Sequence, residues 1–371
     1  MHVKVVSIVP GVALPAPASA LAGAVVVRQL VVGGVKWSKG RRLDEADLRA
    51  LADGDVTQAW PASGPSSGTA GAPPETVTIL VPEPGDVHED AAAARLAAAV
   101  AGPGLVVRGP SESRFDLVAA HAGEVRARVP VLERLNAVDG IAVFSVLDGQ
   151  LIAEGTLVAS VKTGPHIIAA ASLLRAEAIA ARGGLARPVV EVRPYVPRRV
   201  AAVVKETLSD SARARFEGTL RARVAGLSST LAEVSYVADE PAAVAAEFRR
   251  LVRGPARVDL LLTAGAASTD PSDAIFVAFE AIGGRVVSHG VPAHPGSMLW
   301  LGRARTTTFL GLPTCGTYSK ATAADLLLPW LVAGEAADRR TVARLAHGGI
   351  LTREMRFRFP PYARSLEAPD G

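Results

Sequence analysis

The chain has 371 residues, of which 49% are hydrophobic and 5% are aromatic. This length predicts two or three domains with sizeable cores. The formal net charge of +4 comes from scattered arginines rather than from a basic block. Because nucleic-acid binding needs a concentrated basic face, often with aromatic side chains that stack on bases, we do not expect a nucleic-acid partner.

The single cysteine, Cys315, excludes an internal disulfide framework and suits a reducing, cytoplasmic compartment. No uninterrupted run of about twenty apolar residues is present, so no membrane span is expected. Residues 3–20 imitate a secretory signal in part, but Pro10 and Gly11 interrupt the apolar run. Residues 3–9 read equally well as a first strand, and we favour that interpretation.

Residues 1–195 are expected to form a mixed α/β and β-rich region. Within it, residues 61–75 are a low-complexity insert rich in Pro, Gly and Ser, which predicts a mobile surface loop. Asp-Gly turns separate short apolar runs between residues 105 and 162 and indicate a β-rich subdomain. The other expected elements are strands over 25–32 and 77–81 and helices over 43–54, 88–100 and 165–182.

Pro194 and Pro197 lie between two strand-like runs and mark a domain boundary, because proline cannot donate to a central ladder. Residues 196–335 then alternate strands with helices, which predicts a three-layer α/β domain with a mostly parallel sheet. Residues 336–371 are assigned as a C-terminal tail. The part after Gly349 is rich in Arg and Pro and is expected to be extended.

The first of two strand-loop-helix units in this domain begins with a buried strand expected over residues 258–262. After a small-residue loop, Asp270 can serve as the N-cap of a helix, Pro271 fits the first helical position and Asp273 falls at the third. Apolar residues then repeat at helical spacing, and the helix is expected to end at the glycine pair 283–284.

The second unit has a strand over 306–310, a small-residue loop and a helix that begins near Tyr318. Two such units place two loops and two helix N-termini at the carboxyl edge of the sheet, where ligands bind. Backbone N–H groups there attract oxyanions. Asp270 and Asp273 beside an oxyanion predict a bridging divalent cation such as Mg²⁺. The alternative is that Asp-Pro-x-Asp is only a good helix start.

The loops of these two units share a pattern of small and polar residues. The pattern comprises Thr263, Gly265, Ser268, Asp273, Gly283, Gly284, Pro295, Gly296, Gly311, Leu312 and Pro313. It resembles the molybdenum-cofactor biosynthesis domain of molybdopterin adenylyltransferases and molybdopterin molybdotransferases. The resemblance extends upstream through residues 39–54 and 87–102, so it covers most of the chain at the level of the family.

The resemblance implies that the ligand is molybdopterin or its adenylylated form, that molybdate is inserted with cleavage of the adenylate, and that the protein is a homo-oligomer. It implies that Asp273 is the catalytic carboxylate and that Asp270 and Asp273 bind Mg²⁺. The implied ligand contacts are Thr263, Gly265, Ser268, His294, Gly296, Ser297, Gly311, Pro313, Thr314 and Gly316.

Several residues depart from the family pattern. Ala266 replaces a glycine, His294 and Ser297 stand where lysines are usual, and residues 314–316 replace Gly-Asn-Pro. The first strand motif is also altered, in residues 203–215. Because lost lysines remove charge-assisted contacts to an oxyanion, the alternative function is a non-catalytic protein that binds the cofactor and delivers it to a client molybdoenzyme.

Four other candidates are weighed against structural roles. His88, Glu89 and Asp90 occupy consecutive helical positions, so they are helix-start charges rather than one metal site. His289 and His294 lack a zinc spacing, and an oxyanion contact suits His294 better. Cys315 precedes a helix start, which can activate a thiol, although packing is the simpler role. Lys320 either reaches the oxyanion or is a solvated surface residue.

Overall fold

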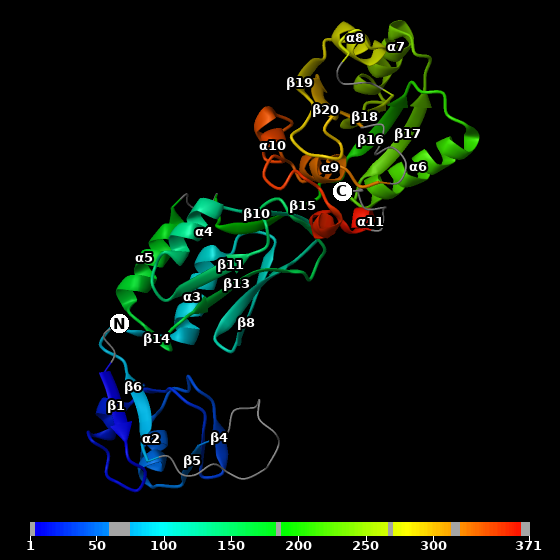
Figure 1. Ribbon diagram of the computed structural model, residues 1–371. Coiled ribbons are helices and arrows are strands. Elements are labelled where there is room, and N and C mark those ends of the chain that lie inside the picture. The colour runs from blue at the N-terminus through cyan, green and yellow to red at the C-terminus, as the bar shows by residue number, and fades with distance from the viewer. Residues whose placement is uncertain (1–3, 59–74, 183–186, 266–269, 313–319, 365–371) are drawn as a thin grey trace.

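The computed structural model describes residues 4–58, 75–182, 187–265, 270–312 and 320–364. The described chain forms three successive modules, which follow one another along the molecule (Figure 1). The N-terminal module ends with strand β6 (Val77–Val81), the middle module ends with strand β15 (Val190–Pro194), and the C-terminal module follows. The first two modules have a hydrophobic cluster each, and the third has one on either face of its sheet.

The N-terminal module contains two small antiparallel sheets, with orders β1-β6-β2 and β4-β3-β5. The expected first strand is present as β1, which pairs with β6 as a strand of the module. Helix α2 begins with a capping box in which Asp44 and Asp47 exchange bonds with each other's backbone N–H. The remaining bounds are α1 (Ala18–Leu21), α2 (Glu45–Ala52), β1 (Lys4–Ile8), β2 (Val25–Val26), β3 (Leu30–Val32), β4 (Val35–Trp37) and β5 (Val56–Gln58).

The middle module contains two sheets of more than two strands, with orders β11-β13-β9-β8 and β12-β10-β15. Helices α3 (Glu89–Val100) and α5 (Ala170–Ala181) share its hydrophobic cluster, and both agree with the helices expected from periodicity. A further helix, α4 (Val129–Asn136), lies within the part expected to be β-rich. The strands are β7 (Val87–His88), β8 (Leu105–Ser111), β9 (Arg114–Ala119), β10 (Gly123–Ala127), β11 (Ile141–Ser145), β12 (Leu151–Ile152), β13 (Leu157–Thr163) and β14 (Ile167–Ile168).

The C-terminal module is built on a six-stranded sheet of order β17-β16-β18-β21-β20-β19. Only β20 runs against the others, so the sheet is mostly parallel. The strands are β16 (Arg199–Val204), β17 (Thr230–Tyr236), β18 (Leu260–Ala264), β19 (Arg285–His289), β20 (Trp300–Ala304) and β21 (Thr307–Gly311).

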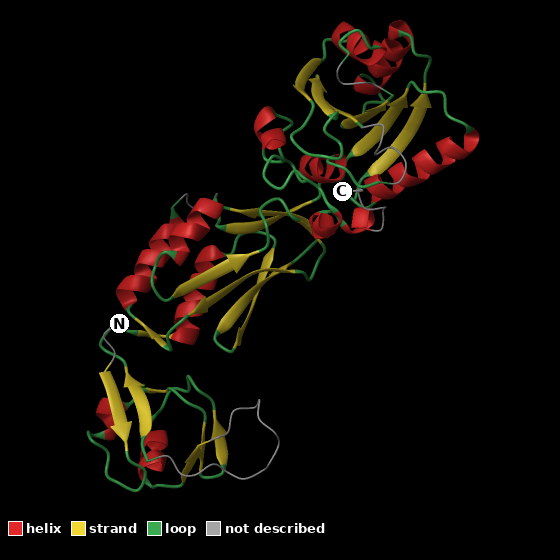
Figure 2. Ribbon diagram, viewed as in Figure 1, coloured by secondary structure: helices red, strands yellow, loops and turns green. Residues whose placement is uncertain are grey.

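Helices cover both faces of this sheet (Figure 2). Helices α6 (Asp210–Ala225) and α9 (Ala324–Val332) share one apolar cluster with the inward residues of β16, β18 and β21. Helices α7 (Pro241–Val252) and α8 (Ala274–Ala281) pack on the other face, around Phe248, Phe279 and Phe309. The α/β fold class and the three-layer C-terminal domain expected from the sequence are confirmed.

The expectation of an extended tail after Gly349 is wrong. The chain forms α10 (Arg339–Ala343), a 3-10 helix (Arg353–Arg358) and α11 (Pro361–Arg364). Leu345, Leu351 and Phe359 are buried in the cluster shared by α6 and α9. Because these apolar side chains bury surface against the module, the segment folds back on it despite its arginines and prolines. Among the described helices, none is both long and apolar enough to cross a membrane.

The middle and C-terminal modules are joined by a polar network. Glu335 accepts from Arg126 at 2.6 Å and from Arg193 at 2.9 Å. Arg344 reaches Glu124, a fully buried side chain, at 3.0 Å. Burial raises the pKa of Glu124 to about 7, although the charges of Arg344 and Arg126 lower it.

Candidate functional site at the carboxyl edge

Helix α8 places Asp273 at the carboxyl edge of the sheet. Asp273, rather than Asp270, is its N-cap, and the Asp273 carboxylate accepts the N–H of Ile275 at 2.9 Å. Asp270 instead accepts from the backbone and hydroxyl groups of Ser272, which hold its pKa below the ordinary value. The expected N-cap was therefore three residues too early, because Asp270 forms a separate turn before the helix.

Lys205 is the residue that sequence reasoning missed. It directly follows strand β16, and its ammonium lies 2.9 Å from Asp273 Oδ2 and 2.9 Å from Asp239 Oδ1. The side chains of Lys205 and Asp273 are each 8% exposed, whereas that of Asp239 is 60% exposed. Burial lowers the pKa of Lys205, but hydrogen bonds and charges from both aspartates outweigh this effect and raise it.

Strand β18 ends beside this lysine. The side chain of Thr263 is buried, and its hydroxyl has no hydrogen-bond partner within the described chain. Gly265 has φ +94°, and a Cβ atom there would lie 3.0 Å from the Lys205 side chain and 2.7 Å from that of Glu206. A glycine is therefore required both by the backbone conformation and by the close approach of the β16 loop.

The next helix start also lies at this edge. Ser209 caps α6 by accepting from the N–H of Ala212. Arg213, in the first turn, stacks over the ring of Tyr236 at 4.3 Å, at the end of strand β17. The carboxyl edge thus combines a buried ammonium, a guanidinium, a buried hydroxyl and two helix N-termini, which is a suitable environment for an oxyanion.

The loop between β19 and β20 supplies the expected residues His294, Gly296 and Ser297. His294 is exposed, and its backbone pairs with residues 349 and 351. Gly296 has φ +105° and approaches the backbone of Ala323 so closely that a Cβ would lie 2.9 Å from its nitrogen. Gly296 therefore seats this loop against the residue before helix α9.

Gly311 has a packing role. A Cβ atom there would lie 1.9 Å from Nε1 of Trp300, so the indole occupies the space that a side chain would need. The expected contacts Ser268, Pro313, Thr314 and Gly316 lie outside the described residues, as does Cys315. Thr263, Gly265 and Asp273 are the expected residues that gather around Lys205.

The histidine candidates have structural partners. His88 contacts the carbonyl oxygen of Gly40 at 2.8 Å and so joins the middle module to the N-terminal one. Glu89 contacts His166 at 2.7 Å within the middle module. His289 packs its ring against Phe276. Lys320 contributes its backbone carbonyl to Arg223.

The carboxylate oxygens of Asp270 and Asp273 are the expected Mg²⁺ ligands, and most of them already have partners. One oxygen of Asp273 caps the helix and the other pairs with Lys205, and one oxygen of Asp270 is engaged by Ser272. Across the described ranges, no group of three or more metal-ligating side chains is found. These residues do not fit a cation held by protein ligands alone, because the Lys205 ammonium already neutralises Asp273.

Comparison with known proteins bears on the same part of the chain. Residues 200–333 match the family model described as "Probable molybdopterin binding domain". Among solved structures, the chain is similar to a molybdopterin biosynthesis MoeA protein from Pyrococcus horikosii, with 15% identity, a TM-score of 0.28, and coverage of 70% of this chain and 80% of that one. It is also similar to the molybdopterin biosynthesis enzyme MoaB from Thermus thermophilus, with 21% identity, a TM-score of 0.27, and coverage of 38% and 99%.

Because both identities are below 25% and both TM-scores are below 0.5, these two likenesses carry no argument about the function of this chain. Among curated proteins, no sequence matches the chain. The matched range begins inside strand β16 and ends directly after helix α9, so it includes Lys205, Thr263 and Asp273. The C-terminal α/β domain of this chain is therefore similar, over residues 200–333, to the family of probable molybdopterin binding domains.

Proposed function

We propose that the C-terminal domain binds molybdopterin or its adenylylated form at the carboxyl edge of the sheet. The observation that carries this proposal is the family match over residues 200–333, which includes the buried Lys205 and the helix starts around it. A phosphate group of the ligand is placed beside Lys205 and the N-terminus of α6, whose backbone N–H groups attract anions. The unpartnered hydroxyl of Thr263 supplies a further donor.

Asp273 has a positioning role in this proposal. One oxygen of its carboxylate pairs with the Lys205 ammonium, and the other caps the start of helix α8. A phosphate that approaches Lys205 would compete with the exposed Asp239 for the ammonium, rather than with the buried Asp273. The expected contacts from the loops at Gly296 and Gly311 remain part of the proposal.

Metal dependence is a separate part of the proposal. Mg²⁺ commonly binds one or two carboxylates together with phosphate oxygens of the substrate. Here the free oxygen of Asp270 and the ligand phosphate would share the ion, because Asp273 is engaged by Lys205. Because the ligand phosphate supplies part of its coordination, binding of Mg²⁺ should require the pterin ligand. Molybdate is proposed as a second oxyanion substrate.

Two activities are compatible with such binding. One is insertion of molybdate with release of the adenylate, and the other is delivery of the cofactor to a client molybdoenzyme. The second is favoured by the engagement of Lys205 with two aspartates, which leaves no free lysine among the described residues of this edge. We also propose a cytoplasmic homo-oligomer, which light scattering at micromolar concentration will test.

Calorimetric titration with molybdopterin and with its adenylylated form tests binding directly. The full chain is expected to bind, and Lys205→Met is expected to lose at least tenfold in affinity, because a charge-assisted hydrogen bond contributes about 1.5–3 kcal/mol. Arg249→Ala, which removes an exposed charge on α7, should bind like the wild type. Equal affinity in the Lys205 variant would contradict the site.

Incubation with adenylylated molybdopterin, molybdate and Mg²⁺ then separates the two activities. Release of adenylate supports insertion. Tight binding without adenylate release, followed by transfer to an apo-molybdoenzyme, supports delivery. Asp273→Asn should weaken either outcome, because it loosens Lys205, whereas the matched Asp239→Asn change at the exposed partner should have a smaller effect.

A further inference from the structure

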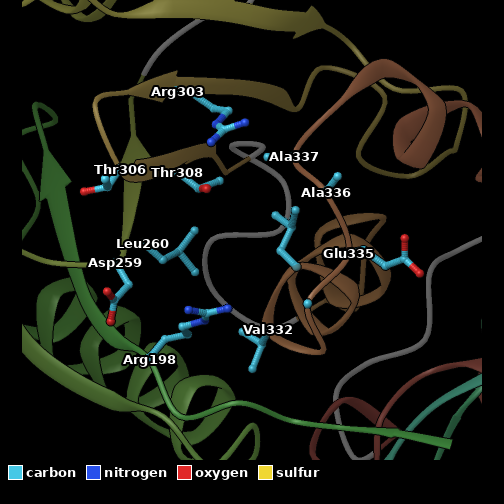
Figure 3. Close-up of a pocket in the computed structure, with 12 residues that line it drawn as sticks. Arg198, Asp259, Leu260, Arg303, Thr306, Thr308, Val332, Glu335, Ala336 and Ala337 are labelled. Atoms are coloured by element: carbon cyan, nitrogen blue, oxygen red, sulfur yellow. The ribbon is translucent and has the colours of Figure 1, made fainter. Parts of the chain in front are cut away.

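A cavity lies at the opposite, amino edge of the same sheet (Figure 3). It has a volume of about 350 Å³, within the range of small-molecule sites. Strands β18, β20 and β21 and the residue before β16 line one side, and the end of helix α9 with the loop after it lines the other. The side chains that matter are Arg198, Arg303, Thr306, Thr308 and Asp259.

The polar residues of this cavity stand where the sheet pattern calls for apolar ones. Along β16, the residues that face α6 and α9 are Val200, Ala202 and Val204, and Arg198 precedes them at the same alternation. On β20 and β21, Arg303 pairs in register with Thr308. These two residues lie two positions along their strands from the buried pair Leu301 and Leu310, and so on the same face of the sheet. The apolar face of the sheet therefore ends in two arginines and a threonine.

The two guanidinium groups enter the cavity from opposite sides of Leu260, as Figure 3 shows. Within the described part of the chain, neither Arg198 nor Arg303 has an ion-pair partner or a side-chain hydrogen bond, and Arg198 is half-buried. Two carboxylates also line the cavity, and each has a partner other than these arginines. Asp259 accepts the backbone N–H of Arg199 at 2.9 Å, and Glu335 points away from the cavity toward the arginines of the middle module.

A structural role at the end of helix α9 does not account for these arginines. The last carbonyls of that helix are satisfied by backbone N–H groups, with Ala333 bonding to Pro329 at 2.8 Å and Glu335 bonding to Trp330 at 2.9 Å. The carbonyl of Val332 accepts from the N–H of Val196. Since these acceptors have partners, the guanidinium groups are left to face the cavity.

More positive charge surrounds the cavity. A second hollow of about 420 Å³ shares Thr306 with it and is lined by Arg253, Arg257 and Arg305. Of these, Arg257 donates to the hydroxyl of Thr306. Five arginines and two carboxylates thus border two hollows that share Thr306, and this excess of positive charge favours a ligand that carries more than one negative charge.

We propose that the amino edge is a second ligand site, which binds a small molecule bearing a phosphate or diphosphate group. Arg198 and Arg303 grip the phosphate oxygens from either side, because the planar guanidinium presents paired donors that match an oxyanion. Thr308 donates its hydroxyl to the same group. This site goes beyond the proposed function, since it lies on the opposite edge from Lys205 and uses none of the residues there.

Calorimetric titration of the full chain with inorganic pyrophosphate tests the proposal. The wild type is expected to bind one equivalent at this site, and Arg303→Ala and Arg198→Ala are each expected to weaken binding by roughly tenfold or more. Arg249→Ala is the charge-matched control, because Arg249 lies on α7 over the other face of the sheet, and it should leave the affinity unchanged.

Three results would overturn the site. Pyrophosphate that fails to bind the wild type rules it out. Affinity that survives both arginine substitutions places the ligand elsewhere. An equal loss in Arg249→Ala shows that only net charge is sensed. Melting curves of each variant without ligand show that it is folded, and none of these results depends on whether molybdopterin binds at Lys205.

Discussion

The two edges of the C-terminal sheet use positive charge in opposite ways. At the carboxyl edge, the buried ammonium of Lys205 is already paired with Asp273 and Asp239. At the amino edge, Arg198 and Arg303 face a cavity without ion-pair partners in the described chain. Both edges belong to the domain that contains the family match, and the second also borders the junction with the middle module.

This difference suggests that the charge at the carboxyl edge stabilises the fold, whereas the charge at the amino edge is available for a ligand. A buried ion pair is costly to break, since removal of one partner leaves an uncompensated charge. Exposed or half-buried arginines have little effect on folding and are available for a ligand. Substitutions at the carboxyl edge should therefore change stability strongly, and substitutions at the amino edge should change ligand binding alone.

The largest effect is expected for Lys205→Met. The change leaves the buried carboxylate of Asp273 without its cation, so the free energy of unfolding should fall by about 3 kcal/mol. Urea denaturation of wild type and variant measures this loss. Lys205→Arg keeps the charge and should recover most of the stability. A Lys205→Met protein as stable as the wild type would show that Asp273 is not held by this lysine.

A change of pH should act on the module junction at the amino edge rather than on Lys205. The pKa of Glu124 is about 7 in the folded protein, against an ordinary value of 4.5. Between these values the folded state holds a proton that the unfolded state has lost, so stability falls as the pH rises from about 5 to about 7. The expected loss is about 2 kcal/mol.

Melting curves across this pH range measure the effect. Glu124→Gln, which removes the titrating group but keeps an acceptor for Arg344, should flatten the dependence. The raised pKa of Lys205 keeps its ammonium charged throughout the range. If Glu124→Gln retains the full pH dependence of stability, another titrating group is responsible for it.

A smaller effect is expected for Gly265→Ala at the carboxyl edge. The residue has φ +94°, and the new Cβ would press on the side chains of Lys205 and Glu206. The free energy of unfolding should fall by about 1–2 kcal/mol. Gly218→Ala is the matched control, because Gly218 lies inside helix α6 with no atom near its Cβ position, and there alanine should stabilise the protein.

The smallest effect on stability is expected for Arg303→Ala at the amino edge. Because its guanidinium has no ion-pair partner within the described chain, thermal stability without ligand should stay within about 0.5 kcal/mol of the wild type. Calorimetric unfolding measures this difference. A loss as large as that of Lys205→Met would remove the contrast between the two edges.

The sequence predicted the fold well where periodicity was strong. The helices over 88–100 and 165–182 and the first strand-loop-helix unit appear with shifts of a few residues at their ends. In the second unit, helix α9 begins at Ala324 rather than near Tyr318, which lies outside the described residues. The N-cap was misplaced because Asp270 and Asp273 both suit a cap, and only the turn at Ser272 decides between them. The tail was misjudged because its arginines and prolines hid apolar residues that complete a core, such as Phe359.

The site was only partly predictable. Thr263, Gly265 and Asp273 could be chosen from their spacing, but their common neighbour Lys205 lies more than fifty residues earlier in the chain. One signal was available: Lys205 directly follows the apolar run of β16, as the first candidate loop directly follows β18. The arginines of the amino edge come from separate strands, so no local pattern could bring them together.

The proposed binding of the pterin ligand at the carboxyl edge depends on Lys205. Calorimetric titration with molybdopterin, on wild type, Lys205→Met and Arg303→Ala measured side by side, tests this dependence. We expect the wild type and Arg303→Ala to bind with equal affinity, and Lys205→Met to lose at least tenfold. Retained affinity in Lys205→Met together with lost affinity in Arg303→Ala would instead place the pterin ligand at the opposite edge.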